Sequence, residues 1–136
     1  MLIVFFVFQA CTILMPSAEA AKQVLILNSY HQGYKWTDDE TRGIIDGLGE
    51  KAENVKFYIE YMGTKWTFDP EYYDLLKSFY KKKFQSITFD TIVATDNDAF
   101  NFLRLYRDDV FGKVPTVFCG VNWLRQEDLA ESTLFT

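Results

Sequence analysis

The sequence is poor in the residues that would suggest a disulfide-bonded or metal-binding protein. It has two cysteines and one histidine among 136 residues. Cys11 lies in an apolar N-terminal stretch, so Cys119 would stand alone in a domain without that stretch, and one thiol cannot form an internal disulfide. No second ligand stands at metal-binding spacing from His31. We therefore expect a domain held together by its hydrophobic core, with no metal and no cofactor.

Positive charge is also scarce. The formal net charge is -5, and the only run of basic residues is Lys81-Lys82-Lys83. Binding to nucleic acid requires a basic face that neutralises phosphates, so nucleic acid is not an expected partner. About half of the residues are apolar and about a quarter are charged, as in a globular protein, and the chain is long enough for one domain with its own core.

No apolar run has the roughly 20 residues that a membrane span needs. Residues 2–15 are almost wholly apolar, although no Lys or Arg precedes them, and Ala18-Glu19-Ala20 resembles a small-x-small cleavage site. We expect residues 1–20 to be a signal peptide for export to the periplasm or another extracytoplasmic compartment. There are two alternatives: this segment is retained as a membrane anchor, or the chain is lipidated at Cys11.

Common enzyme motifs are missing as well. The chain has no Gly-x-Ser-x-Gly elbow, no Gly-x-x-x-x-Gly-Lys phosphate loop and no Gly-x-Gly-x-x-Gly turn. The paired acidic residues that a receiver domain places after its first strand are replaced by Asn28-Ser29-Tyr30. These absences favour a binding protein over an enzyme.

What the chain does contain is a regular alternation of apolar, β-rich runs with helix-like segments. This pattern predicts an α/β fold: a doubly wound parallel sheet with helices on both faces, in three α/β/α layers. The expected strands are Val24–Ser29, Val55–Met62, Thr91–Thr95 and Thr116–Val121, and the expected helices are Asp38–Lys51, Pro70–Phe84, Asn97–Val110 and Arg125–Glu131.

Two of the helices begin with capping patterns. Thr37 and Glu40 have the spacing of a capping box, which explains this acidic stretch better than catalysis does. Asp69 precedes Pro70, the residue best suited to a first helical position. In that second helix, the stripe expected to face the sheet is Tyr72, Leu75, Leu76 and Phe79.

Polar and aromatic residues follow each expected strand. The carboxyl ends of parallel strands meet at one edge, where open α/β sheets bind ligands. Asp96 would attract an ammonium group and helix N-termini an anion, so an amino-acid-like zwitterion would suit both. Packing for the aromatic residues and simple solvation for the lone histidine are the competing interpretations. The candidate ligand-binding residues are Ser29, Tyr30, His31, Tyr34, Trp36, Thr64, Thr95, Asp96, Asn97, Gly120 and Asn122.

Four segments carry a resemblance to a known family. They are VLILNSYHQGYKWT at residues 24–37, YIEYM at 58–62, FDTIVATDNDAF at 89–100 and VPTVFCGVN at 114–122. Residues 22–136 resemble the first lobe of ABC-transporter substrate-binding-type domains, in the version used as extracytoplasmic input of bacterial sensor histidine kinases and diguanylate cyclases. The resemblance implies a type I periplasmic-binding-protein-like fold whose two lobes close on a small ligand.

The sequence as given corresponds to one such lobe. We therefore expect either a fragment or a half-site that works with a partner, such as the second lobe, a membrane-bound sensor or a permease. The expected function is non-enzymatic binding of a small molecule, as a signal-transduction input. A binding protein for solute uptake, or a small α/β enzyme using Asp96 or His31, are the alternatives.

Overall fold

The computed structural model describes residues 20–67 and 69–125. These residues form four strands, three α-helices and one 3-10 helix. In chain order they are β1 (Lys22–Asn28), α1 (Lys35–Gly47), η1 (Gly49–Asn54), β2 (Val55–Tyr61), α2 (Pro70–Lys83), β3 (Thr91–Thr95), α3 (Asp96–Val110) and β4 (Thr116–Cys119).

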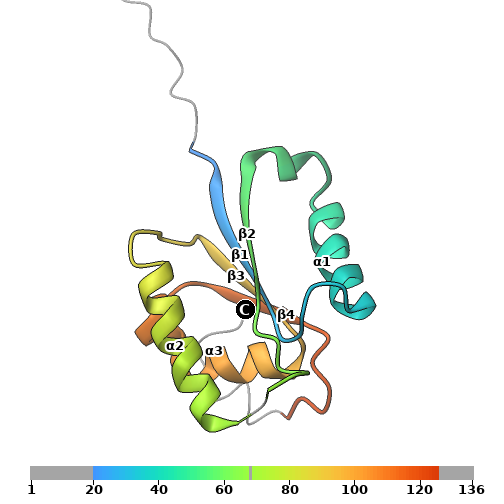
Figure 1. The fold of residues 1–136 in the computed structure, drawn as a ribbon. Coiled ribbons are helices and arrows are strands. Elements are labelled where there is room, and N and C mark those ends of the chain that lie inside the picture. Colours follow the sequence, from blue (N-terminus) through green and yellow to red (C-terminus); the bar gives the residue numbers. More distant parts are fainter. Residues whose placement is uncertain (1–19, 68, 126–136) are drawn as a thin grey trace, which may run out of the picture.

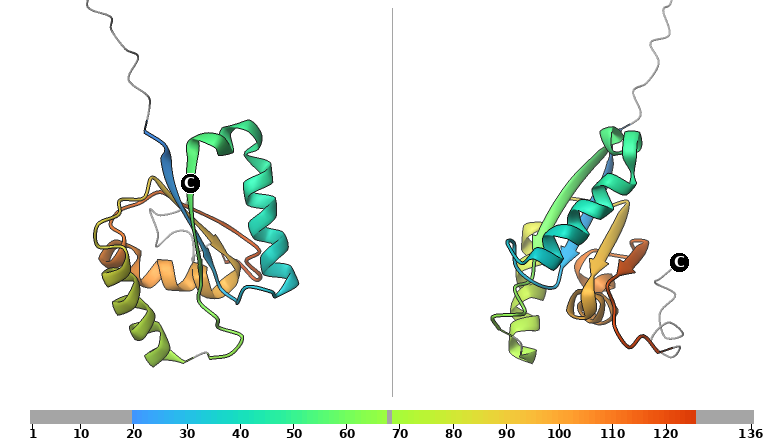
Figure 2. Two further views of the ribbon diagram at one scale, coloured as in Figure 1. Left: turned by 45° about the horizontal axis from the view of Figure 1, so that its top comes forward. Right: turned by 90° about the vertical axis from the view of Figure 1, so that its right-hand side faces the viewer.

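The four strands form one parallel sheet in the order β2-β1-β3-β4. Its helices lie on both sides, with α1 on one face and α2 and α3 on the other (Figures 1 and 2). Parallel strands are joined by crossovers, and each helix here occupies one crossover. The predicted three-layer α/β/α fold is confirmed.

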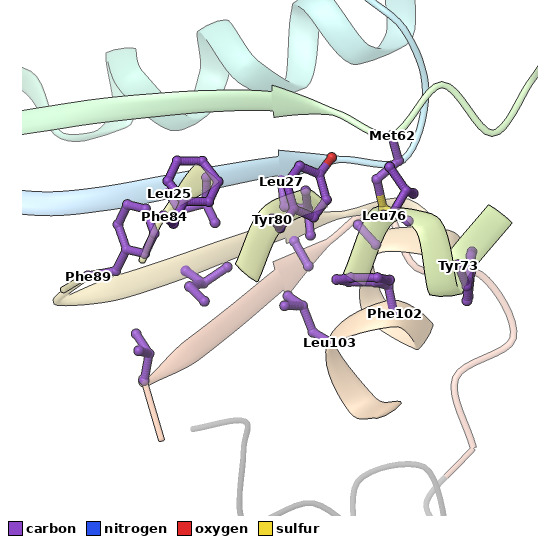
Figure 3. Packing of buried hydrophobic residues seen from close by; sticks show 14 residues of the cluster. Leu25, Leu27, Met62, Tyr73, Leu76, Tyr80, Phe84, Phe89, Phe102 and Leu103 are labelled. Atoms are coloured by element: carbon purple, nitrogen blue, oxygen red, sulfur yellow. The ribbon is translucent and has the colours of Figure 1, made fainter. Parts of the chain in front are cut away.

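The main hydrophobic core lies between the sheet and the α2–α3 layer (Figure 3). Side chains alternate between the two faces of a strand, so Leu25 and Leu27 of β1 both point into this layer. Tyr80 of α2 is 1% exposed and packs against the rings of Phe84 and Phe102. Much of the aromatic content of the chain is thus used for packing in this core.

The inner face of α2 differs from the predicted stripe. Its buried residues are Tyr73, Leu76 and Tyr80, whereas Leu75 and Phe79 are 63% and 51% exposed. The helix does begin as predicted, with Pro70 in its first turn and Asp69 accepting a hydrogen bond from the Tyr72 N–H at 2.7 Å.

The first helix begins earlier than predicted. It starts at Lys35 after Tyr34, and no side chain caps it at that residue. Thr37 is therefore inside the helix and fully buried, and its predicted capping box is wrong. The predicted signal peptide and the predicted helix from Arg125 fall outside the described residues, apart from Ala20 and Arg125 themselves. Within the described part of the chain, no helix has the length and apolarity to cross a membrane.

Candidate functional site

The register of the sheet brings the ends of the strands level with one another. Asn28 pairs with Tyr61 on one side and with Thr95 on the other, and Thr95 pairs with Cys119. The loops that leave these strands therefore start from one edge of the sheet, at the bottom of the view in Figure 1. This is the edge at which open α/β sheets bind their ligands.

Two buried hydroxyl groups hold the loops of this edge together. Ser29 Oγ donates to the carbonyl oxygen of Thr95 at 2.6 Å and accepts the N–H of Ala99 at 2.8 Å. Thr64 Oγ1 lies 2.7 Å from the carbonyl oxygen of Ser29 and 2.6 Å from Asp98 Oδ2. Both side chains were predicted to bind ligand, and in the structure their hydrogen-bonding capacity is largely used within the protein.

Two more predicted residues make internal contacts. Thr95 is fully buried and donates to Asn28 Oδ1 at 2.9 Å. Asn97 holds the segment after β4, because its amide group both donates to the carbonyl oxygen of Asn122 and accepts the N–H of that residue, at 2.9 and 3.0 Å. Asn122 itself is exposed, and its side-chain amide lies 3.5 Å from the carbonyl oxygen of Gly120.

A pair of carboxyl groups lies beside Gly120. Asp96 is the first residue of α3, is only 2% exposed, and has the left-handed backbone angle φ 64° that non-glycine residues rarely adopt. Its Oδ1 atom accepts a hydrogen bond from Trp36 Nε1 at 3.2 Å. Glu40 of α1 reaches the same point, since a Cβ atom at Gly120 would lie 2.2 Å from Glu40 Oε1 and 3.3 Å from Asp96 Oδ1.

The two carboxyl groups share a hydrogen bond, which requires a proton on one of them. Burial, followed by the negative charge of Asp96, raises the pKa of Glu40 to about 7. Burial also raises the pKa of Asp96. Their second oxygens, Glu40 Oε2 and Asp96 Oδ2, are buried with no hydrogen-bond partner among the described residues. Glu40 thus keeps its proton to a higher pH than an ordinary glutamate, and the pair leaves acceptor capacity unused.

Cys119 lies within the field of this pair. Its side chain is half-buried, and burial together with the charges of Glu40 and Asp96 raises the pKa of the thiol to about 11. The thiolate is the reactive form of cysteine, so this environment keeps the side chain unreactive at neutral pH.

Aromatic side chains form the outer part of the site. The rings of Tyr30 and Tyr34 meet edge to face, with centroids 5.5 Å apart, and the ammonium group of Lys65 lies 4.3 and 5.4 Å from their centroids. His31 is half-buried against the ring of Trp66 at 4.2 Å, and its Nδ1 atom has no partner in the described part of the chain.

All three tryptophans of the chain follow the ends of strands at this edge and are exposed. The exposed fractions are 54% for Trp36, 73% for Trp66 and 93% for Trp123. Tryptophan carries the largest apolar area of any side chain, and exposed apolar clusters with a polar rim mark binding surfaces. We call the following residues the strand-tip site: Tyr30, His31, Tyr34, Trp36, Glu40, Lys65, Trp66, Asp96, Gly120 and Asn122.

A hollow of about 720 Å³ lies elsewhere. It is an open groove on the α1 face of the sheet, lined mainly by apolar residues such as Val24, Ile44, Leu48, Val93 and Val117. Parallel sheets normally have both faces covered, and α1 covers only part of this one. The charged side chains in its lining, Lys22 and Asp90, pair with each other at 3.5 Å, so we place the candidate site at the strand tips, where more polar groups converge.

Sequence reasoning missed two members of the strand-tip site and left a third out of the candidate list. Glu40 was assigned to helix capping, and only the tertiary fold brings it to Asp96. Lys65 was expected at the end of the second strand beside Thr64, and Trp66 follows it, so a position after a strand end was the available signal. Within residues 20–67 and 69–125, no group of three or more His, Cys, Asp or Glu side chains is arranged to hold a metal ion.

Comparisons with known proteins add no family assignment. No protein-family model, curated protein or solved structure matches this chain.

Proposed function

We propose that this chain is a non-enzymatic, small-molecule-binding lobe of an exported substrate-binding or sensor protein, and that it serves as a signal-transduction input. The observation that carries the proposal is the strand-tip site itself. Trp36 donates to Asp96, a buried aspartate whose Oδ2 atom has no partner among the described residues, and the exposed Trp66 and Trp123 follow β2 and β4 at the edge where this fold class binds ligands.

The sequence resemblance supplies the rest of the proposal. The motif of residues 24–37 resembles the extracytoplasmic inputs of sensor kinases and cyclases, and it provides Tyr30, Tyr34 and Trp36 of the site. In a two-lobed protein of this kind, a second lobe would close over the strand-tip site and bury the ligand. A periplasmic location, a partner permease or sensor, and the second lobe all belong to the proposal.

A thermal-shift screen of the chain against amino acids, small organic acids and sugars tests this function. A ligand of the strand-tip site should raise the Tm. Asn122→Ala should reduce that shift without changing the Tm of the free protein, because among the described residues its side chain makes a single hydrogen bond, at 3.5 Å to the Gly120 carbonyl oxygen. Asn54→Ala, at an exposed position at the far end of the sheet, is the matched control. An identical shift in the two variants would contradict the assignment.

The Glu40–Asp96 pair favours a second candidate, an enzyme that uses acid–base chemistry. A carboxyl group with a pKa of about 7 is suited to proton transfer at neutral pH. The two functions differ in the fate of the ligand. Incubation of any ligand found in the screen, followed by NMR of the small molecule, should return it unchanged for a binding lobe, whereas its conversion, abolished by Glu40→Gln, would establish the enzyme.

A further inference from the structure

The ammonium group of Lys65 is held by aromatic rings at the strand-tip site. It lies 4.3 Å from the centroid of the Tyr30 ring and 5.4 Å from that of Tyr34. The faces of aromatic rings attract cations, and a pair of rings set edge to face can hold one cation between them. Lys65 itself is exposed, and no ion pair fixes it within residues 20–67 and 69–125. Its side chain is thus free to leave this place for solvent.

The charges around this place are predominantly negative. Burial and the carboxylates of Asp96, Asp98 and Glu40 raise the pKa of Tyr30 to about 12, and Lys65 acts in the opposite sense by lowering the pKa of Asp96. Asp96 is 2% exposed, and its Oδ2 atom has no hydrogen-bond partner among the described residues. A buried carboxylate with unused capacity favours an additional positive charge nearby.

The start of α3 is poorly suited to an anion. Helix N-termini usually attract negative groups through free N–H groups. Here the N–H of Ala99 is already bonded to Ser29 Oγ, and Asp96 and Asp98 occupy the first turn. A ligand carboxylate or phosphate would therefore meet like charge at this end of the site.

From these observations we propose that the ligand of the strand-tip site presents a protonated amine to the Tyr30–Tyr34 ring pair, in the field of Asp96, and that Lys65 occupies this place until the amine displaces it. The proposal rests on the proposed function and adds the chemical class of the ligand. The competing hypothesis is that Lys65 binds an anionic group of the ligand. The two hypotheses predict opposite effects on ligand affinity when the charge of Lys65 is removed.

The test uses three probes of equal length: butylammonium, 1-butanol and butyrate. Each is titrated into the ¹⁵N-labelled chain while the indole N–H signals of Trp36 and Trp66 are followed by NMR. We expect butylammonium to shift these signals at the lowest concentration and butyrate at the highest. In Lys65→Met the Kd for butylammonium should fall about two- to fivefold, the equivalent of one cation–π contact. In Asp96→Asn it should rise about threefold or more.

Lys51→Met is the matched control, because it removes one exposed lysine of η1, far from the site, and should leave the Kd unchanged. Asparagine tolerates the left-handed backbone of position 96, and a dispersed spectrum verifies that this variant folds. Weaker butylammonium binding in Lys65→Met, or an equal response to butyrate, would overturn the amine proposal. If only the neutral or anionic probe shifts the indole signals, the amine proposal fails while the site stands. If no probe shifts them, both fail.

Discussion

Gly120 and Glu40 share one small space at the strand tips, which leaves no room for a side chain at position 120 while Glu40 keeps its place. A Cβ atom at Gly120 would lie 2.2 Å from Glu40 Oε1, and the backbone there has φ 68°, which favours glycine. Gly120→Ala should therefore lower the free energy of unfolding by about 1–3 kcal/mol, measured by urea denaturation.

The double variant tests the cause of that loss. In Glu40→Ala/Gly120→Ala the shorter side chain at position 40 removes the clash. The double variant should therefore lose less unfolding free energy than the two single variants lose together, and what remains is mainly the backbone strain at position 120. Strict additivity would show that the two residues are not in contact.

The raised pKa of Glu40 predicts a dependence of stability on pH. The folded protein holds the proton of Glu40 up to a pKa of about 7, whereas the unfolded chain loses it near the ordinary value of 4.5. The stability that the neutral form contributes is complete below about pH 4.5 and is lost as the pH rises toward 7. Glutamine imitates the neutral form, so Glu40→Gln should match the parent at pH 4.5 and exceed it at pH 8.

Solvent screens this half-exposed carboxyl group, so we expect the difference at pH 8 to be about 1 kcal/mol, or about 4 °C in Tm. Thermal unfolding followed by circular dichroism at the two pH values measures it. Glu53→Gln, at an exposed position of η1, is the control and should show no such divergence. A Tm difference between Glu40→Gln and the parent that stays constant with pH would refute the shared proton.

At the scale of elements, Ser29 joins the end of β1 to the start of α3. Its hydroxyl is buried and makes two hydrogen bonds, to the Thr95 carbonyl oxygen and from the Ala99 N–H. Ser29→Ala leaves the Ala99 N–H without its partner and should cost about 1–3 kcal/mol of unfolding free energy. Ser78→Ala, on the exposed side of α2, should change stability by less than 0.5 kcal/mol in the same assay. Equal losses in the two variants would remove Ser29 from this role.

The order of elements could be predicted from sequence because it depends on local patterns. Apolar β-rich runs, helix spacing and the Asp69–Pro70 cap are all read from neighbouring residues, and the structure confirms the four strands and their parallel pairing. The start of α1 does not depend on the predicted capping box of Thr37 and Glu40. Gly33, with φ 89°, turns the chain early, and its N–H bonds to Asp38 Oδ1 at 3.1 Å, so the helix begins before Thr37 can cap it.

The chemistry of the site could be predicted only in part, because some of its residues are placed by tertiary contacts and not by local patterns. Residues directly after strands, such as Tyr30, Asp96 and Asn122, are placed by the parallel sheet alone. Glu40 comes from the second turn of α1, and its pairing with Asp96 requires the helix to cross the sheet at one particular place. No sequence spacing encodes that crossing, because it is set by packing between α1 and the strands.

At the scale of the whole molecule, the two faces of the sheet are covered unequally. α2 and α3 bury one face, whereas the groove beside α1 leaves Val93 half-exposed and Val117 39% exposed. An apolar groove of this size should bind a hydrophobic dye such as anilinonaphthalene sulfonate in the folded state. The double variant Val93→Thr/Val117→Thr should reduce the dye fluorescence while the strands persist, because threonine suits strands as well as valine does.

The control for the groove is Leu75→Thr, which removes an apolar side chain of α2 that is 63% exposed away from the groove. It should leave the dye signal unchanged. Equal reduction by both changes would mean that the dye reports general surface apolarity and that the groove is not a distinct feature of the fold.

Ligand binding at the strand tips can be observed directly by NMR. The three tryptophans of the chain all lie at that edge, so their indole N–H signals in a ¹H–¹⁵N spectrum report on the site directly. Titration with any ligand from the screen should shift the indole signals of Trp36 and Trp66 together, while backbone signals at the opposite edge, such as those of Gly49 and Val114, stay in place. Shifts confined to that opposite edge or to the α1 groove, with both indole signals unmoved, would contradict the account.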